Sequence, residues 1–127
     1  MKILAQSKNF IIQNEYESVF LTKKGSKIII GDFYGDPKDA IIDFKERWGV
    51  VVGCGLIIYY FREPFEAYSE KKSSQWDELF RTKDDEWWIE TVYQVSENEI
   101  RFVVDPNSEY RELYQLDVSN LKYQKLF

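Results

Sequence analysis

Short apolar runs alternate with polar turns along most of this chain. The runs are rich in Val, Ile, Tyr and Phe, and the turns between them carry Gly, Asn, Ser or Lys. This pattern predicts short β-strands joined by hairpins. The strands expected in the first half of the chain are residues 3–5, 10–12, 18–22, 27–33, 40–44 and 48–52.

The chain changes direction after residue 52 and then enters its most continuous apolar segment. Gly53 and Gly55 flank Cys54, and glycines in a strand pattern indicate a bulge or a sharp corner where another backbone comes close. Residues 56–61 read LIIYYF, without a polar position. An apolar run of this length predicts a central strand that is covered on both faces.

Residues 62–86 differ from the segments around them, because charged residues dominate and β-branched residues are scarce. We expect one short helical insertion at about residues 64–81. Ser74 is suited to cap its N-terminus, with Asp77 three residues later as in a capping box. Three apolar residues would then share one face of the helix: Trp76, Leu79 and Phe80.

Strand patterning returns at Trp87 and continues to the end of the chain. The strands expected there are residues 87–95, 100–104, 110–116 and 121–126, with a strong turn at 105–108. The fold class is therefore mainly β (α+β), with an antiparallel meander that forms a curved sheet, a half-barrel or a sandwich around the helical insertion. We find neither a linker nor an internal repeat, so residues 1–127 are expected to form a single domain.

Charge narrows the range of partners. The chain has 17 Lys and Arg residues against 22 Asp and Glu residues, which gives a formal net charge of −5. Residues 1–31 sum to +3, so residues 32–127 sum to −8. We expect no nucleic-acid partner, because sequence-independent binding rests on Lys and Arg that neutralise phosphates. The acidic part could speed the encounter with a basic partner, or it could serve solubility alone.

The composition also removes most catalytic chemistry. The chain has no His, which excludes Ser-His-Asp and Cys-His sites and nearly every zinc arrangement. Cys54 is the only cysteine, and its apolar neighbours favour a buried, inert thiol. Paired carboxylates could serve a hydrolase, but no spacing selects a pair. We therefore predict that the protein is not an enzyme and uses no cofactor.

Four aspartates in the first half could supply oxygen ligands to a hard cation. They are Asp32, Asp36, Asp39 and Asp43. The alternation of Asp or Asn with a central Gly that marks a calcium loop is missing, so turn and strand-flanking roles are favoured over a metal site.

The chain is expected to work in the cytoplasm without a membrane partner. Its first residues contain no long apolar stretch of the kind found in signal peptides. The longest apolar run, residues 48–61, is shorter than the ~20 residues that span a bilayer. A single cysteine also fits a reducing compartment.

Two adjacent tryptophans supply the clearest candidate for a binding site. On a strand Trp87 and Trp88 must point to opposite faces, so the core takes one of them. The other is either exposed or covered by the helical insertion. Three acids directly precede the pair, and an exposed Trp with an acidic rim is typical of a protein-binding hot spot. The predicted partner-binding residues are Asp84, Asp85, Glu86 and Trp87, with Glu97 and Glu99 across the hairpin in support.

The sequence GDFYGDP at residues 31–37, followed by AIID at 40–43, WGVVVG at 48–53 and GLIIY at 55–59, resembles a segment of small bacterial immunity proteins. Those proteins protect a cell from the toxin domains of contact-dependent inhibition and related polymorphic toxin systems. The resemblance covers about residues 31–61. It implies a small, acidic, cytoplasmic protein that binds and neutralises a cognate toxin domain, in many cases a nuclease. The alternative is a small-ligand-binding β-barrel with an aromatic-lined pocket.

Overall fold

The computed structural model describes residues 1–105 and 112–127, and the regular secondary structure of these residues consists of β-strands. The strands form three four-stranded antiparallel sheets and a two-stranded ribbon. The N-terminal sheet contains β1 (Lys2–Gln6), β2 (Phe10–Glu15), β3 (Ser18–Lys23) and β4 (Ser26–Asp32). The central sheet contains β5 (Asp39–Ile42), β6 (Trp48–Gly53), β7 (Gly55–Tyr60) and β8 (Trp76–Leu79). The C-terminal sheet contains β11 (Ile89–Gln94), β12 (Glu99–Val104), β13 (Leu113–Asp117) and β14 (Tyr123–Lys125). The ribbon consists of β9 (Arg81–Thr82) and β10 (Asp85–Glu86).

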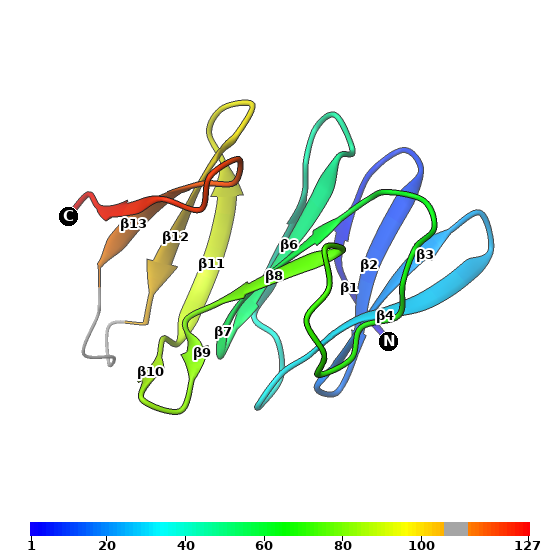
Figure 1. Ribbon diagram of the computed structural model, residues 1–127, viewed down its shortest axis with the longest axis horizontal. Helices are drawn as coiled ribbons and strands as arrows, with labels where there is room; N and C mark the ends of the chain where they lie inside the picture. Colours follow the sequence, from blue (N-terminus) through cyan, green and yellow to red (C-terminus); the bar gives the residue numbers. More distant parts are fainter. Residues whose placement is uncertain (106–111) are drawn as a thin grey trace.

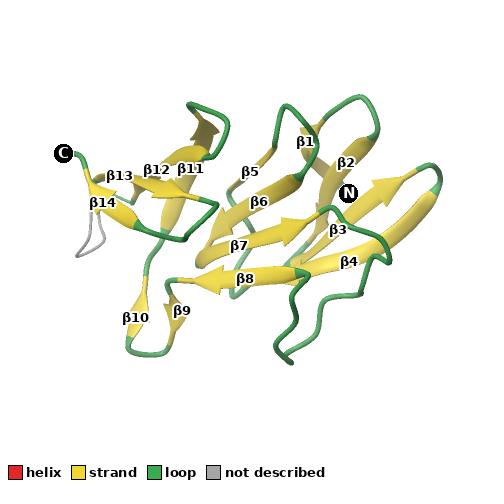
Figure 2. Cartoon of the chain, turned by 45° about the horizontal axis from the view of Figure 1, so that its top comes forward, coloured by secondary structure: helices red, strands yellow, loops and turns green. Residues whose placement is uncertain are grey.

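The central sheet lies between the other two sheets, so the molecule has three layers (Figure 1 and Figure 2). Within each sheet the strands are neighbours in the order in which they occur in the chain. The prediction of a mainly β, antiparallel meander is confirmed. Of the three shapes left open by the sequence, the sandwich describes the structure best, with one sheet more than a simple sandwich has.

Strands β6 and β7 are buried on both faces because each face packs against a different outer sheet. All residues of β6 are buried, and so are all residues of β7 except the last. Val50 and Ile58 belong to the core shared with the C-terminal sheet. Val51 and Ile57 belong to the core shared with the N-terminal sheet. A strand with a core on each face needs an apolar residue at every position, which explains the unbroken apolar run in this segment.

The corner predicted around Cys54 is confirmed and brings the two tryptophans into place. Gly55 has a φ of +88°, in the region that favours glycine, and a Cβ there would lie 1.9 Å from Cγ of Arg81. The Gly55 N–H donates a hydrogen bond of 2.8 Å to the Trp87 carbonyl. Cys54 forms an isolated antiparallel bridge with Trp88. The corner therefore fixes the backbone of both tryptophans against the central sheet.

The helical insertion predicted at about residues 64–81 is wrong. The segment is a loop followed by β8, which pairs with β7 at the edge of the central sheet. Trp76 stacks on Tyr59 across this pair, with ring centroids 6.3 Å apart and planes inclined by 12°. Trp76 packs in the N-terminal core and Leu79 against the C-terminal core. Pairing with β7 outweighs the helix-capping signal, because a short isolated helix has little stability of its own.

The hairpins expected in the first half of the chain are present, with strand ends that differ by up to three residues. The turn predicted at 105–108 lies outside the described residues from residue 106 onward, as does the start of the strand predicted at 110–116. Within the described ranges, no helix is long and apolar enough to cross a membrane.

Candidate functional site

The acids that were predicted to form one surface lie at opposite ends of the C-terminal sheet. Asp84, Asp85 and Glu86 belong to the β9–β10 ribbon and its turn, before β11, whereas Glu97 and Glu99 lie at the turn after β11 (Figure 1). β11 has six residues, which corresponds to about 20 Å at ~3.3 Å per residue. The ribbon acids therefore form no cluster with Glu97 and Glu99, whose contact with a partner stays a prediction.

Glu97 links two hairpins. Its carboxylate accepts a hydrogen bond of 2.8 Å from Lys45 Nζ, and Arg47 donates to its backbone carbonyl. The hydrogen bond from Lys45 lowers the pKa of Glu97 below its ordinary value. Glu97 thus helps to hold the β5–β6 hairpin against the β11–β12 hairpin.

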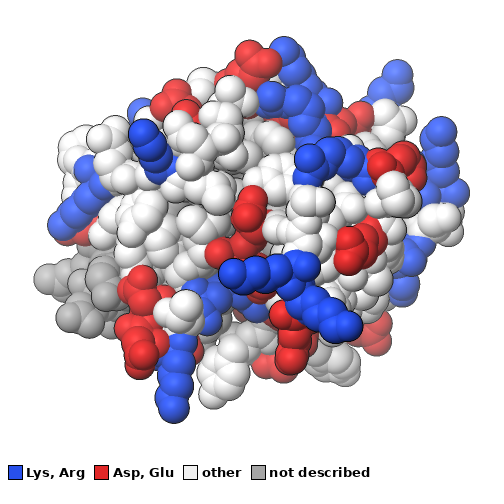
Figure 3. Space-filling view, in the orientation of Figure 1, with Lys and Arg blue, Asp and Glu red and all other residues white. Residues whose placement is uncertain are grey.

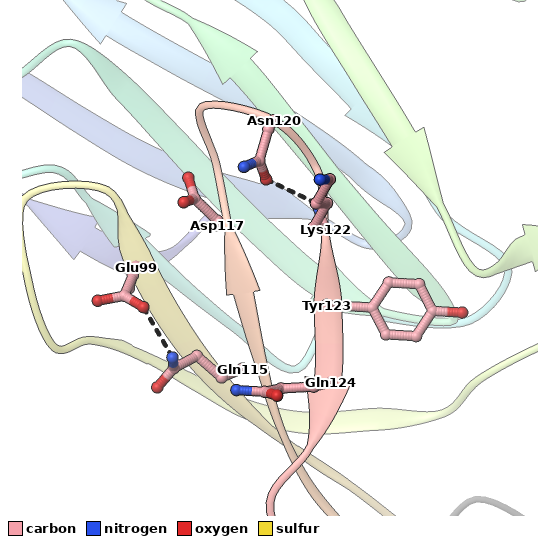
Figure 4. Close-up of a pocket in the computed structure, with 7 residues that line it drawn as sticks. All are labelled: Glu99, Gln115, Asp117, Asn120, Lys122, Tyr123 and Gln124. Atoms are coloured by element: carbon pink, nitrogen blue, oxygen red, sulfur yellow. Dashed lines mark hydrogen bonds between the residues drawn. The ribbon is translucent and has the colours of Figure 1, made fainter.

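Glu99 lines an open, polar hollow of about 210 Å³ formed by strands β12, β13 and β14 (Figure 4). Its carboxylate accepts hydrogen bonds of 2.8 Å each from Ser96 Oγ and Gln115 Nε2. The second acid of the hollow, Asp117, accepts hydrogen bonds from Ser119, and these lower its pKa. A lowered pKa is the opposite of what a general acid needs. Both carboxylates are engaged by neighbouring polar groups, and we do not assign this hollow a function.

The core takes one of the two tryptophans, as predicted, and Trp87 is the buried one. Neither lies in a strand, because β10 ends at Glu86 and β11 begins at Ile89. The Trp87 ring is 4% exposed and stacks on Phe80 with centroids 3.9 Å apart and planes inclined by 8°. Its Nε1 donates a hydrogen bond of 2.9 Å to Asp85. Trp88 is 38% exposed. The exposed aromatic residue beside the acids is therefore Trp88, and the predicted contact residue Trp87 belongs to the core.

Trp88 forms an exposed aromatic pair with Tyr34, from the loop between β4 and β5. The ring centroids lie 6.2 Å apart, and the planes meet at 65°, an edge-to-face arrangement. Tyr34 is 74% exposed. Gly35 follows with a φ of +78° and brings the loop close to the Trp88 ring. Two large aromatic side chains from distant parts of the chain thus meet at the surface.

Acidic side chains flank this pair on the side of the β4–β5 loop. Glu17, in the turn between β2 and β3, accepts a hydrogen bond of 2.5 Å from the Gly35 N–H. Asp36 follows Gly35 in the loop, and both carboxylates belong to exposed residues. The hydrogen bond ties the loop, and Tyr34 with it, to the N-terminal sheet.

Further acids flank the pair on the side of the β9–β10 ribbon. Asp84 and Glu86 are exposed, and the Glu86 carboxylate lies 3.7 Å from Cys54 Sγ. Burial raises the pKa of the Cys54 thiol, and Glu86 raises it further, so this group stays protonated at neutral pH. The ribbon also carries two cations. Arg81 donates to the Asp32 backbone carbonyl and pairs with Glu78. Lys83 is exposed in the turn beside Asp84.

We define the acidic–aromatic surface by the residues of these three groups. They are Glu17, Tyr34, Asp36, Asp84, Glu86 and Trp88. In Figure 3, which has the orientation of Figure 1, acidic side chains recur along the lower edge, where the ribbon and the β4–β5 loop lie, with basic side chains between them. The sequence reasoning missed Glu17, Tyr34 and Asp36. Tyr34 lies between Asp32 and Asp36 in a turn that contains Gly35, and this pattern is visible in the sequence. The pattern does not reveal that the turn contacts Trp88.

Two of the four aspartates considered as metal ligands, Asp39 and Asp43, are engaged in hydrogen bonds within the protein. Asp39 accepts a hydrogen bond of 2.8 Å from Thr91 Oγ1. Asp43 is fully buried and accepts hydrogen bonds from Arg47 Nε at 2.6 Å and Gln94 Nε2 at 2.8 Å. Burial alone raises the pKa of Asp43, but these hydrogen bonds outweigh it and lower the pKa. In residues 1–105 and 112–127, no group of three His, Cys, Asp or Glu side chains is arranged to hold a metal ion.

Comparison with known proteins identifies no relative. No family model matches this chain, and no curated protein and no solved structure matches it. The resemblance to small bacterial immunity proteins therefore stays a prediction, and the argument for function rests on the acidic–aromatic surface.

Proposed function

We propose that this chain is an immunity protein that binds a cognate bacterial toxin domain and neutralises it by covering its active site. The observation that carries the proposal is the exposed Tyr34–Trp88 pair within the acidic–aromatic surface. Tyr and Trp are enriched among the residues that dominate binding energy. They bury a large area, and each has few rotatable bonds to immobilise.

The acidic rim specifies the charge of the partner. A protein that acts on nucleic acid presents Lys and Arg to the phosphates. An acidic surface can occupy the same basic site and exclude the substrate. We therefore propose a nuclease as the toxin, and the cytoplasm, where such a toxin would act, as the place of binding.

The aromatic pair is held in place before any partner arrives. The backbone of Trp88 bridges to Cys54, and its carbonyl accepts a hydrogen bond of 2.7 Å from the Asp105 N–H. The loop that carries Tyr34 is tied to Glu17 at one point, and at the end of the loop the backbone N–H of Lys38 donates a hydrogen bond of 2.8 Å to the Val52 carbonyl. A preorganised contact surface loses less entropy on binding.

The alternative, a small-ligand-binding β-barrel, fits the observed architecture less well. Each sheet has two different edge strands, so the sheets are open. The two cores between them are filled with aromatic and aliphatic side chains. We therefore favour the protein-binding role.

The decisive experiment uses the toxin domain that the proposal expects to be encoded beside this gene. Trp88→Ala should weaken binding by at least about thirtyfold, in the range of a hot-spot residue, and should abolish protection of cells that express the toxin. Tyr93→Ala is the matched control, since Tyr93 is 39% exposed on β11, outside the acidic–aromatic surface. Binding is measured by calorimetry, and protection by growth.

The two parts of the proposal fail in different ways. If the neighbouring gene encodes no toxin that this chain binds, the immunity function is wrong. If the chain protects and Trp88→Ala protects as well as Tyr93→Ala, the function stands and the acidic–aromatic surface is wrong.

A further inference from the structure

A groove of about 420 Å³ lies between the tip of the β3–β4 hairpin and the loop that follows β7. Leu21 and Ile28 of the hairpin and Phe65 of the loop give it an apolar lining. Lys23 and Lys24 stand at its rim. Its size falls in the range of about 300–1,000 Å³ that is typical of ligand sites.

The groove is a basic site on an acidic protein. Lys23 and Lys24 outnumber the single acid among the lining residues, Glu63, whereas the side chain of Lys27 pairs with Thr22 on the opposite face of the hairpin. Lys27 places its ammonium group 4.7 Å from the centroid of the Phe20 ring. Lys24 is exposed and makes no ion pair within the described part of the chain. An anionic ligand therefore finds complementary charge here, in a chain whose net charge repels anions elsewhere.

The loop after β7 contacts the hairpin through a carboxylate and an aromatic ring, the two kinds of group that a ligand of the groove would carry. Glu63 forms an ion pair with Lys23. Two residues later, the ring of Phe65 lies under the same ammonium group, with Lys23 Nζ 4.4 Å from its centroid. One lysine thus binds a carboxylate and an aromatic ring of one short segment. A ligand that combines an acid with an apolar ring matches this pattern.

The edge of β4 beside the groove has room for an extended backbone. Lys24 and Gly25 have φ values of 47° and 82°, as in a two-residue type I′ turn. In such a hairpin the pair next to the turn is hydrogen-bonded, so the N–H and C=O of Lys27 point away from β3. Two residues on, the Ile29 carbonyl accepts a hydrogen bond of 2.9 Å from the Tyr68 N–H. The loop thus occupies this edge at Ile29, and in the described residues no backbone group is paired with Lys27 there.

We propose that the groove binds an extended acidic peptide segment of a protein partner. An apolar anchor residue of the peptide packs against the partly exposed Ile28 and Phe65. Carboxylates beside the anchor meet Lys23 and Lys24, and the peptide backbone adds to the edge of β4. This site shares no residue with the acidic–aromatic surface and takes a partner of the opposite charge.

The test uses a capped pentapeptide with two acidic residues on each side of a phenylalanine, titrated into the full chain by calorimetry. Lys24→Asn removes a charge and keeps a residue suited to the turn, and it should weaken binding by about threefold. The double variant Lys23→Gln/Lys24→Asn should weaken it by at least about tenfold. Lys122→Asn, which changes the charge by the same amount as Lys24→Asn but lies just before β14, should leave affinity unchanged.

Changes to the peptide test the anchor without touching the fold of the protein. Alanine in place of phenylalanine should weaken binding by at least about tenfold, and lysine in place of the acids should abolish it. Equal affinity of the double variant and the original chain overturns the proposal. So does the absence of binding at about 1 mM peptide, or binding of decanoate but not of the peptide. Trp88→Ala should bind the peptide normally, so this site and the proposed function fail independently.

Discussion

At the scale of single residues, the sequence predicted that the core takes one of the two adjacent tryptophans, but it did not reveal which of them is exposed. Alternation on a strand predicts that one of them points outward, and the structure exposes Trp88, although neither lies in a strand. Tyr34 could not be placed in the same way, because it belongs to a loop without periodicity. Its contact with Trp88 joins positions 54 residues apart in sequence and depends on the packing of three sheets.

Asp43 is the buried charge on which the contact between two hairpins depends. Replacement by Asn removes the charge that Arg47 and Gln94 face, and we expect a loss of about 2–4 kcal/mol in the free energy of unfolding. Urea denaturation at pH 7 measures this loss. Asp36→Asn is the control, because that acid is exposed and its replacement should change stability by less than about 0.5 kcal/mol.

The pH dependence gives a second measure of the same interaction. The folded state lowers the pKa of Asp43, so its contribution to stability is present above the ordinary carboxyl pKa of about 3.9 and disappears as the pH falls through the lower, folded-state pKa. The difference between the original chain and Asp43→Asn should therefore shrink below about pH 4. A difference that stays constant from neutral pH into this acidic range would show that the charge is not the stabilising feature.

At the scale of elements, local signals predicted the hairpins and failed for β8. The turn at Lys24 and Gly25 and the apolar run of β7 are defined by residues close together in the chain, so the sequence reveals them directly. The helical insertion predicted at about residues 64–81 rested on a capping pattern and on the shared face of Trp76, Leu79 and Phe80. In the structure the same segment forms hydrogen bonds with the edge of β7 and packs its side chains into both cores. Long-range pairing of this kind leaves little trace in the sequence.

The close approach of the N-terminal and central sheets depends on the absence of a side chain at Gly49. A Cβ there would lie 2.9 Å from Ile12 Cδ1 and 3.1 Å from Phe61 Cζ. We expect Gly49→Ala to cost about 1–3 kcal/mol through overpacking. Ile12→Val removes the nearest methyl group and alone should cost about 0.5–1.5 kcal/mol.

The double variant separates overpacking from a general weakness of the strand. Because valine makes room for the new methyl group, Gly49→Ala/Ile12→Val should be destabilised by about 1 kcal/mol less than the sum of the single variants. Thermal unfolding of the four proteins measures this coupling. Strictly additive losses would mean that the cost at Gly49 comes from the strand itself and not from contact between the sheets.

At the scale of the whole molecule, charge is distributed unevenly between the layers. Residues 1–31, which include the first three strands and most of the fourth, sum to +3, and the remaining residues sum to −8. The lysines of the groove therefore lie in a region of opposite sign to the bulk of the chain. An uneven distribution orients the molecule as it approaches a charged partner. The acidic–aromatic surface and the groove are accordingly suited to partners of opposite charge.

Orientation by charge and retention by aromatic contact predict separable kinetics for the proposed toxin complex. Raising the salt concentration from about 50 to about 500 mM should slow association at least about tenfold and change dissociation less than about threefold, because salt screens long-range attraction more than contact. Asp84→Asn/Glu86→Gln should reproduce the slower association at low salt. Trp88→Ala should mainly speed dissociation, since the loss of a buried anchor acts after docking. Surface plasmon resonance resolves the two rates. An association rate that is independent of salt would rule out acidic steering and leave the aromatic pair alone to account for recognition.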